Sequence, residues 1–238
     1  MWENAKMRGK ADGDWAELVE RWKAEQGALR RRIVVKELKE LPRFVAGADA
    51  AFSGDKRTVY AAAVVYDLKE RRIIEVAHAK RAEDVPYVPG FLSFREGPAV
   101  LEAVRQLRRE YGAICFDGQG YAHPRRCGLA THLSVTLDRP GVGVAKSLLV
   151  GEYDEPPAKA GSRTALMDHG EQIGAVLRTQ DGVRPLFVSV GHRVDLASAC
   201  RLVLACCTHY RVPEPTRQAD IEVARLKKQH EPDARARR

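Results

Sequence analysis

Three strand-like segments follow one another with only a few polar residues between them. They span residues 44–52, 58–67 and 72–80, and each is rich in β-branched, aromatic or small apolar residues. Gly54 marks the first connection, and the charged residues 69–71 mark the second. Because strands joined by such short connections pair antiparallel, this part of the chain predicts a three-stranded meander.

Helical and strand patterns alternate after the meander. Apolar residues at helical spacing predict a helix over 96–109, with Ser93 as its candidate N-cap. A short apolar strand follows at 113–117, and a strand reached through a helix makes the sheet a mixed one. Further apolar runs lie at 141–149, 164–178 and 186–190, and further helices are expected over 13–30, from an Asp195 cap to 210, and over 216–229. The pattern predicts one α/β domain, with a mixed sheet (antiparallel meander followed by parallel strands) flanked by helices.

Composition narrows the class of protein. The 238 residues include 40 Lys and Arg against 32 Asp and Glu, a formal net charge of +8, which favours a polyanionic partner. No apolar run approaches the ~18 residues that a membrane-spanning helix needs. The charged first 25 residues lack the apolar core of a signal peptide. We therefore expect a cytoplasmic protein with no membrane partner. Its five cysteines, an odd number without a CxxC pair, are expected to be reduced thiols.

Two aspartates stand in or at the end of apolar strands. Asp49 lies inside segment 44–52, and Asp117 closes segment 113–117. A carboxylate there is costly to bury unless it is paired or binds a cation, so neighbouring strands would bring both acids to one Mg²⁺ site. Two simpler interpretations stay open, because Asp117 is also suited to start a turn and Asp49 to bind local backbone.

Two further acids lie near the starts of predicted helices. Glu96 opens one helix, and Asp220 lies early in the last one. A helix N-terminus favours an acid in any protein, so neither position by itself indicates a metal site. The spacing of the four acids is not a local metal-binding motif.

Segment 117–130 combines glycines with basic and imidazole side chains. These residues are Gly118, Gly120, Gly128, His123, Arg125 and Arg126. The glycines allow close approach of backbone N–H groups, and the side chains are donors suited to phosphate. A competing zinc site would use His123, Cys127 and His132, at spacings unlike those of zinc fingers. Catalysis by a Cys127 nucleophile would need a base that nothing in the sequence marks.

Three other residues are candidates for a functional site. Tyr87, between Pro86 and Pro89, would be presented on a stiff loop, which suits an aromatic wedge between bases as well as an ordinary packed loop. Lys146, among small and apolar residues, is either an edge residue or a cation of the site. His192, between a strand and a helix, is either a structural histidine or part of a site.

Several motifs, taken in order, resemble one known family. They are Gly47-Ala48-Asp49, the run from Pro86 to Glu96, the run from Asp117 to Ala130, Gly143-Val144-Ala145-Lys146-Ser147, Gly191-His192-Arg193, and the run from Pro213 to Asp220. The chain resembles endonuclease V, the deoxyinosine-directed nuclease family of the RNase H-like fold. The resemblance runs from about residue 15 to 228. We therefore expect a catalytic domain over 15–229, an N-terminal extension over 1–14 and a charged tail over 230–238.

The resemblance implies roles for individual residues. The catalytic set would be Asp49, Glu96, Asp117 and Lys146. The metal ligands would be Asp49, Glu96, Asp117 and Asp220, the last at a position that is acidic in some members and histidine in others. The substrate-binding set would be the wedge residues Pro86, Tyr87, Val88 and Pro89, the pocket residues Gly90, Leu92, Gly118, Gln119, His123 and Leu129, and also His192.

The resemblance also implies an activity. We expect a monomeric DNA repair endonuclease that uses Mg²⁺, or Mn²⁺ in its place, to hydrolyse the second phosphodiester bond 3′ to deoxyinosine, leaving 3′-hydroxyl and 5′-phosphate ends. Two alternatives stay open. One is a ribonuclease directed at inosine in RNA, because contacts to a 2′-hydroxyl leave no obvious motif. The other is a protein that binds inosine without cutting.

Overall fold

The computed structural model describes residues 12–83, 85 and 87–231, and Pro86 lies outside them. Its strands are β1 (Phe44–Phe52), β2 (Thr58–Asp67), β3 (Arg72–Ala82), β4 (Ala113–Asp117), β5 (Gly141–Ala145), β6 (Arg163–Asp168), β7 (Glu171–Leu177) and β8 (Leu186–His192). Its helices are α1 (Asp12–Arg31), α2 (Leu92–Arg105), α3 (Leu129–Leu137), α4 (Leu196–Cys206) and α5 (Glu214–His230). The predicted boundary between an N-terminal extension and the catalytic domain stays a prediction.

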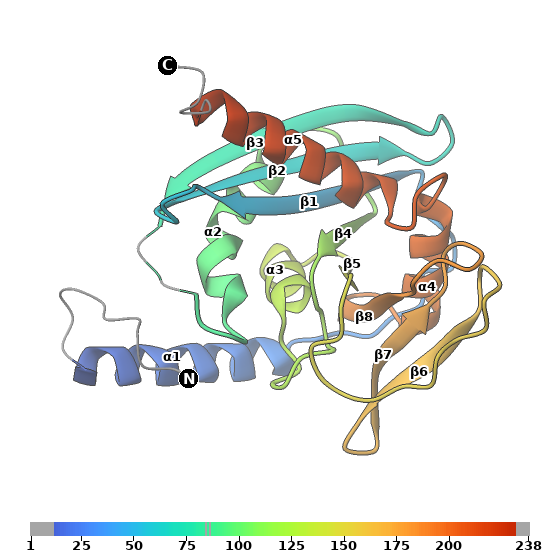
Figure 1. The fold of residues 1–238 in the computed structure, drawn as a ribbon, viewed down its shortest axis with the longest axis horizontal. Helices are drawn as coiled ribbons and strands as arrows, with labels where there is room; N and C mark the ends of the chain where they lie inside the picture. Colours follow the sequence, from blue (N-terminus) through green and yellow to red (C-terminus); the bar gives the residue numbers. More distant parts are fainter. Residues whose placement is uncertain (1–11, 84, 86, 232–238) are drawn as a thin grey trace.

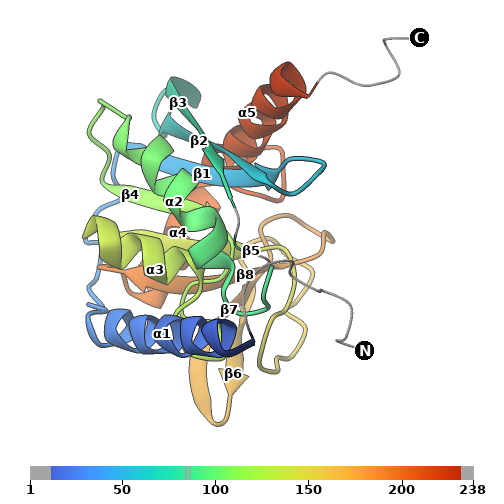
Figure 2. The ribbon, with the colours of Figure 1, turned by 90° about the vertical axis from the view of Figure 1, so that its left-hand side faces the viewer.

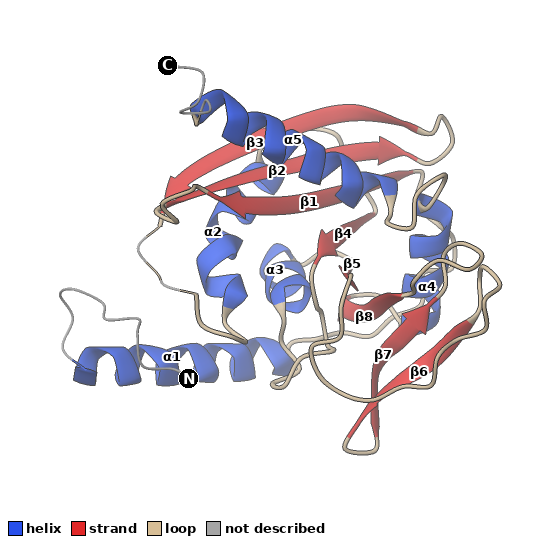
Figure 3. Ribbon diagram, in the orientation of Figure 1, coloured by secondary structure: helices blue, strands red, loops and turns tan. Residues whose placement is uncertain are grey.

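One mixed sheet of eight strands, in the order β3-β2-β1-β4-β5-β8-β7-β6, organises the described residues (Figures 1 and 3). The strands β1, β2 and β3 form the predicted antiparallel meander. The strand β4 then pairs parallel to β1, and β5 pairs parallel to β4. The remaining three strands are antiparallel. The predicted fold class, an antiparallel meander followed by parallel strands and flanked by helices, is confirmed.

Helices cover both faces of the sheet. Side chains alternate along a strand, so Ala46 and Ala48 of β1 pack with α2 and α3, while Val45 belongs to the core cluster that includes α4. The helix α5 packs on the same face as α4, across β1 and β2 (Figure 1). Figure 2 shows α1, α3 and α2 stacked on the opposite side.

The helix α3 was not expected from the sequence. Every residue from Leu129 to Val135 is buried, so the segment lacks the polar face that gives an amphipathic helix its 3.6-residue pattern. The helix α2 begins at Leu92, four residues earlier than predicted. The prediction that Ser93 caps this helix is therefore wrong: Ser93 lies inside α2, and its Oγ is 3.0 Å from His132 Nδ1.

Other boundaries differ by a few residues. The strand β5 ends at Ala145 rather than 149, and α4 ends at Cys206 rather than 210. Asp195 does cap α4, because its side chain accepts a hydrogen bond from the Ser198 N–H at 2.7 Å. All five cysteines are free thiols, as predicted. No helix among the described residues combines the length and apolar character needed to span a bilayer.

Candidate active site

The carboxyl ends of the parallel strands bring the predicted catalytic residues to one edge of the sheet. In the register of β1 and β4, Ala48 lies opposite Phe116, so Asp49 and Asp117 are the next residues on neighbouring strands. Asp117 in turn lies opposite Val144 of β5, and Lys146 comes directly after that strand.

Close packing brings α5 to the same place. A Cβ atom at Gly47 would overlap the backbone of Pro215, so only glycine allows the first turn of α5 to lie this close to β1. Gly47 and Asp49 share a face of β1, because side chains alternate along a strand. The start of α5 therefore lies beside Asp49, and Asp220, exposed on the same helix, adds its charge to the field at Asp49.

Burial perturbs two of the carboxylates. It raises the pKa of Asp49 to about 8, and the charge of Asp117 adds to this effect. The Ala50 N–H donates a hydrogen bond of 2.8 Å to Asp49 Oδ1, which opposes the rise. Burial also raises the pKa of Glu96 to about 7, against the charge of Arg95 and with that of Asp117. Both carboxylates therefore lie where negative charge is poorly compensated.

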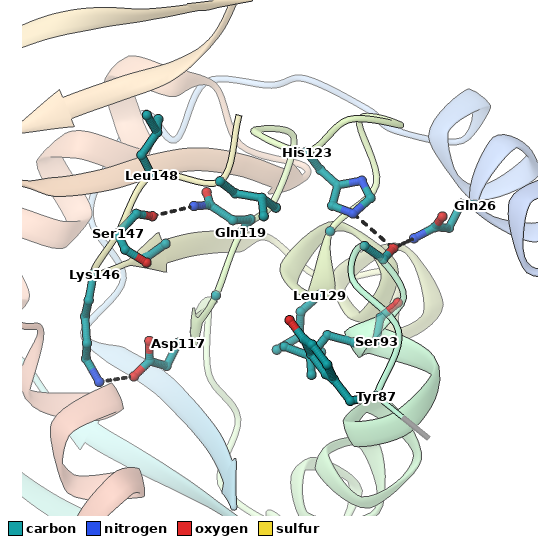
Figure 4. Close-up of a pocket in the computed structure, with 16 residues that line it drawn as sticks. Gln26, Tyr87, Ser93, Asp117, Gln119, His123, Leu129, Lys146, Ser147 and Leu148 are labelled. Carbon is teal, nitrogen blue, oxygen red and sulfur yellow. Dashed lines mark hydrogen bonds and ion pairs between the residues drawn. The ribbon is translucent and has the colours of Figure 1, made fainter. Parts of the chain in front are cut away.

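Lys146 supplies positive charge at this edge. Its ammonium forms an ion pair with Asp117 (Figure 4). Partial burial acts to lower the pKa of Lys146, but the hydrogen bond and charge of Asp117 outweigh it and leave that pKa raised. Lys146 is therefore protonated at neutral pH.

The donor set fits a hard divalent cation. Three carboxylates, those of Asp49, Asp117 and Asp220, act on Lys146 through their charge, and Asp117 also acts on Glu96. Oxygen donors are those that Mg²⁺ and Mn²⁺ prefer. In residues 12–83, 85 and 87–231 no three His, Cys, Asp or Glu side chains converge as a preformed metal cluster. The metal-ligand set stays a prediction.

A cavity of about 350 Å³ opens directly beside Asp117 and Lys146 (Figure 4). The structure brings seven predicted substrate-binding residues to its wall: Tyr87, Gly90, Leu92, Gly118, Gln119, His123 and Leu129. It also adds lining residues that the sequence did not assign to substrate binding, namely Gln26, Ser93, Gly128, Ala145, Ser147, Leu148 and Leu149. Gln26 comes from α1, far from every motif along the chain. No pattern in the sequence identifies it, because its burial depends on how α1 packs.

Glycines allow the cavity wall to pack tightly. A Cβ atom at Gly143 would lie 2.7 Å from Gly118 O, and one at Gly128 would lie 2.9 Å from Gly120 O. The loop after β4 therefore lies directly against β5 and the start of α3. The Gln119 side chain, 8% exposed, donates from Nε2 to Ser147 O at 3.0 Å (Figure 4). Its buried Oε1 has no hydrogen-bond partner among the described residues, so it is available to a donor on a ligand.

His123 is neutral and fixed in one tautomer. The Arg125 backbone N–H donates to Nδ1 at 3.1 Å, so Nε2 carries the proton and donates to Gly90 O at 3.1 Å. Burial lowers the pKa of His123 to about 4, and the charge of Arg125 contributes to that shift. The histidine therefore acts as a neutral donor in the wall of the cavity.

Tyr87 lies at the mouth of the cavity with 60% of its surface exposed. Val88 and Pro89 follow it and lead to Gly90, whose positive φ of 79° turns the chain into α2. Only Pro86 of the four predicted wedge residues lies outside the described residues. An exposed aromatic ring at the mouth of a cavity has the placement that a wedge between bases requires.

His192 lies away from the cavity. It pairs with Gly141 at the opposite end of β5 from Lys146. Its Nδ1 accepts a hydrogen bond from the Val34 N–H at 3.2 Å, and its Nε2 lies 3.0 Å from Asp138 Oδ1. These contacts account for His192 as a structural residue, and its predicted part in substrate binding stays untested.

The contacts of its proposed ligands do not support the zinc alternative, since in the described part of the chain His123, Cys127 and His132 form no cluster. His123 contacts Gly90 O, and His132 contacts Ser93 Oγ instead. Burial raises the pKa of the Cys127 thiol to about 12, which also removes it as a nucleophile.

Comparisons with known proteins agree on one family. Residues 27–221 match the family model described as Endonuclease V. A curated endonuclease V from Roseiflexus sp. (strain RS-1) is 49% identical over 88% of this chain and 93% of its own. The crystal structure of endonuclease V from Streptomyces avermitilis superimposes with a TM-score of 0.85 at 44% identity, covering 89% of this chain and 93% of that one. These likenesses confirm the RNase H-like fold.

A third comparison concerns a ligand. The endonuclease V of Ciona intestinalis, 26% identical, superimposes with a TM-score of 0.80 and covers 90% of this chain and 99% of that one. It was solved in complex with a 24mer DNA containing an inosine followed by a ribo-adenosine.

Proposed function

This chain belongs to the endonuclease V family, whose members are nucleases, and on that premise we propose that it is a DNA repair enzyme specific for deoxyinosine. It would hydrolyse the second phosphodiester bond 3′ to the lesion and leave 3′-hydroxyl and 5′-phosphate ends. One observation carries the proposal: a cavity of about 350 Å³ opens beside the Asp117–Lys146 pair. A base-binding pocket and a hydrolytic site are thus adjacent.

The cavity suits an extruded base. Cavities of roughly 300–1,000 Å³ bind small organic ligands, and an enzyme that reads a lesion in a duplex must rotate the base out of the stack. Tyr87 at the mouth would fill the space that the base leaves. Inside, Gln119 Oε1 and the backbone of Gly118 offer hydrogen-bonding groups to a purine edge. Close packing around Gly118 would exclude the exocyclic amine that distinguishes guanine from hypoxanthine.

Asp49, Glu96, Asp117 and Asp220 would hold one or two Mg²⁺ or Mn²⁺ ions. When bound, such an ion lowers the pKa of a coordinated water and offsets negative charge on the phosphate. The protein contributes by holding the carboxylates on rigid strand and helix ends. The raised pKa values of Asp49 and Glu96 follow from poorly compensated charge, which a divalent cation would relieve.

Lys146 would act through its charge. Because the hydrogen bond and charge of Asp117 outweigh partial burial and raise its pKa, Lys146 would serve as a cation rather than as the base that accepts a proton from water. It would keep Asp117 ionised and donate a hydrogen bond to a phosphate oxygen as negative charge develops there.

Inosine in RNA is the second candidate substrate. The observation that favours it is the Ciona complex, in which a ribo-adenosine follows the inosine. The partner is in either case a nucleic acid that contains inosine, in keeping with the net charge of +8.

The test is Mg²⁺-dependent cleavage of an end-labelled duplex with one deoxyinosine, beside a matched RNA, an unmodified duplex and an Asp49→Ala variant. We expect one nick at the second bond 3′ to the lesion, absent from the variant and from unmodified DNA. Cleavage of the RNA alone would move the function to inosine-containing RNA. Lesion-specific binding without a cut in either substrate would refute the proposal that this chain is a nuclease.

A further inference from the structure

One carbonyl oxygen in the cavity wall accepts three hydrogen bonds. Gly90 O, at the end of the loop that carries Tyr87, accepts from Gln26 Nε2 at 3.0 Å, from His123 Nε2 at 3.1 Å and from Arg125 Nη2 at 2.6 Å. A carbonyl oxygen has two lone pairs, so three side-chain donors saturate it. In Figure 4, the dashed lines drawn from Gln26 and His123, which belong to different segments of the chain, meet at one point.

Gln26 is the centre of this network. It is completely buried, although it lies on α1, a helix rich in charged residues. Besides Gly90 O, its Nε2 donates to Cys127 O at 2.9 Å, and its Oε1 accepts from Arg125 Nε at 2.5 Å. One side chain therefore joins α1, the loop that precedes α2 and the loop that precedes α3. A buried polar group satisfied on every side defines one arrangement of the segments that it joins.

Arg125, which also donates to Gly90 O, is itself held by neighbouring groups. Its guanidinium lies 4.0 Å from the centre of the Phe91 ring. A Cβ atom at Gly90 would lie only 2.7 Å from Arg125 Nη2, so the arginine needs a glycine here. Aromatic contacts also join this region to α1. The Trp22 ring of α1 lies 5.5 Å from the Phe91 ring and stacks on the Phe94 ring at 5.0 Å.

We propose that Gln26, with Arg125, is a positioning residue that anchors the wedge loop (residues 87–90) through the Gly90 carbonyl oxygen, so that Tyr87 can hold the space of an extruded base. This inference rests on the proposed function. Neither residue acts on the scissile phosphate. They fix the loop at its base, while Tyr87 itself remains 60% exposed and free to enter a duplex.

A wedge needs such an anchor because it has to keep an opened base pair from closing. Unstacking and unpairing a base costs a few kcal/mol, so the duplex tends to close again and to push out the inserted side chain. A loop with an exposed aromatic ring and no attachment would be displaced instead. The hydrogen bonds to Gly90 O connect the loop to α1 and to the segment before α3, so the loop keeps its position when Tyr87 is inserted.

The experiment compares the same lesion in two contexts. A duplex requires a wedge, whereas single-stranded DNA with one deoxyinosine has no pair to open. The variant Gln26→Met removes all three hydrogen bonds at nearly constant side-chain length, and Gln229→Met, at an exposed site on α5, is the matched control. We expect Gln26→Met to lower kcat/KM on the duplex by about tenfold or more, the scale of leaving buried polar groups unsatisfied. On the single strand we expect a clearly smaller loss, because the altered cavity wall still acts there but no base pair has to be opened, so the measured quantity is the ratio of the two losses.

A double-mutant cycle tests whether Gln26 acts through Tyr87. If it does, Tyr87→Ala and the Tyr87→Ala/Gln26→Met double variant cut the duplex equally, because the wedge is already lost. Additive losses, or equal losses on duplex and single strand, would overturn the inference. Gln26→Glu keeps the acceptor for Arg125 Nε but loses the donors, so it serves the same test if the methionine variant does not fold.

A second readout separates this inference from the proposed function. The fluorescence of 2-aminopurine placed beside the lesion rises when its neighbour leaves the stack, with or without cleavage. If the unmodified protein cuts neither substrate, the proposed function fails, and the fluorescence still reports the wedge. Full brightening with Gln26→Met would refute an anchoring role, and loss of brightening with intact folding would support it.

Discussion

The two walls of the cavity differ in how their polar groups are satisfied. The acidic wall is the group Asp49, Glu96, Asp117, Asp220 and Lys146, of which Asp117 and Lys146 line the cavity. In this group burial and like charge raise the pKa of Asp49 and Glu96, and Asp117 forms an ion pair with Lys146. The pocket wall is the group Gln26, Gly90, Gln119, His123 and Arg125. Here three hydrogen bonds converge on Gly90 O, two from the neutral side chains of Gln26 and His123 and one from the charged Arg125 guanidinium, and Gln119 Oε1 is left for a ligand.

The difference shows what each wall is prepared for. The pocket wall is preorganised, because its side chains are already held by one another before any ligand arrives. The acidic wall holds excess negative charge in a partly desolvated place, which is unfavourable until a cation arrives. Recognition and hydrolysis should therefore be separable by mutation, by metal and by pH.

The largest expected effect is that of Asp117→Asn, which should abolish most hydrolysis and leave recognition of the lesion intact. Asp117→Asn should lower cleavage by roughly a thousandfold or more, because it removes a ligand charge and the partner of Lys146. The affinity for a deoxyinosine duplex should change by less than about threefold, since the pocket wall is unaltered. Single-turnover cleavage and fluorescence anisotropy measure the two quantities. A parallel loss of binding would show that the two walls are not independent.

Lys146→Gln should have the next largest effect, a loss of roughly a hundredfold in the cleavage rate with little change in affinity. Lys146→Arg should recover part of the rate, because it restores the charge but not the geometry of an ammonium. Both variants should keep the shape of the unmodified protein's pH–rate profile. If Lys146 were a base, the profile would contain a limb from its deprotonation, and both variants would lose that limb. A pH–rate profile from 6 to 9 for both variants checks this.

The pH dependence should separate the walls without mutation. Asp49 and Glu96 have raised pKa values, about 8 and about 7, so both are increasingly protonated as the pH falls through that range. Metal binding requires both ionised forms, so the apparent affinity for Mn²⁺ should fall by about tenfold from pH 8 to 7, and by up to about a hundredfold per pH unit below pH 7, where two protons have to be displaced. Calorimetric Mn²⁺ titration at both pH values measures it.

Recognition should stay constant over the same range. His123, with a pKa lowered to about 4, is neutral throughout, so the ratio of the affinities for lesion and unmodified duplex in the absence of metal should not change between pH 6 and 8. The ratio is used because protonation of Asp49 and Glu96 affects binding of any DNA. A drop in this ratio below pH 7 would indicate a titrating group in the pocket wall.

The smallest effect on activity is expected at His192. Because it lies at the opposite end of β5 from Lys146, His192→Ala should leave cleavage within about twofold of the unmodified protein. It should lower the free energy of unfolding by about 1 kcal/mol or more, because the buried imidazole and its contacts with the Val34 N–H and Asp138 are lost. Urea unfolding and duplex cleavage test this together. A large loss of cleavage with unchanged stability would restore His192 to the substrate-binding set.

The local patterns of the sequence were sufficient for the strands of the meander. The bounds of β1 and β2 are those predicted, because a clear apolar run between turn residues defines each of them. The helix α3 and the start of α2 were missed for opposite reasons. The first is buried on all sides and shows no amphipathic period, and the second begins on a cavity wall where Leu92 and Ser93 face neighbouring segments.

For the site, the sequence by itself determined the residue types and the order of their motifs. It supplied the acids at strand ends, the glycine-rich segment and the tyrosine between prolines, since each follows from local chemistry along the chain. The tertiary structure decided which of these meet. The register of β1, β4 and β5 places Asp49, Asp117 and Lys146 together and separates His192 from them, and α1 brings Gln26 to Gly90. Such convergence depends on strand pairing and helix packing between residues far apart in the chain, and no local pattern encodes it.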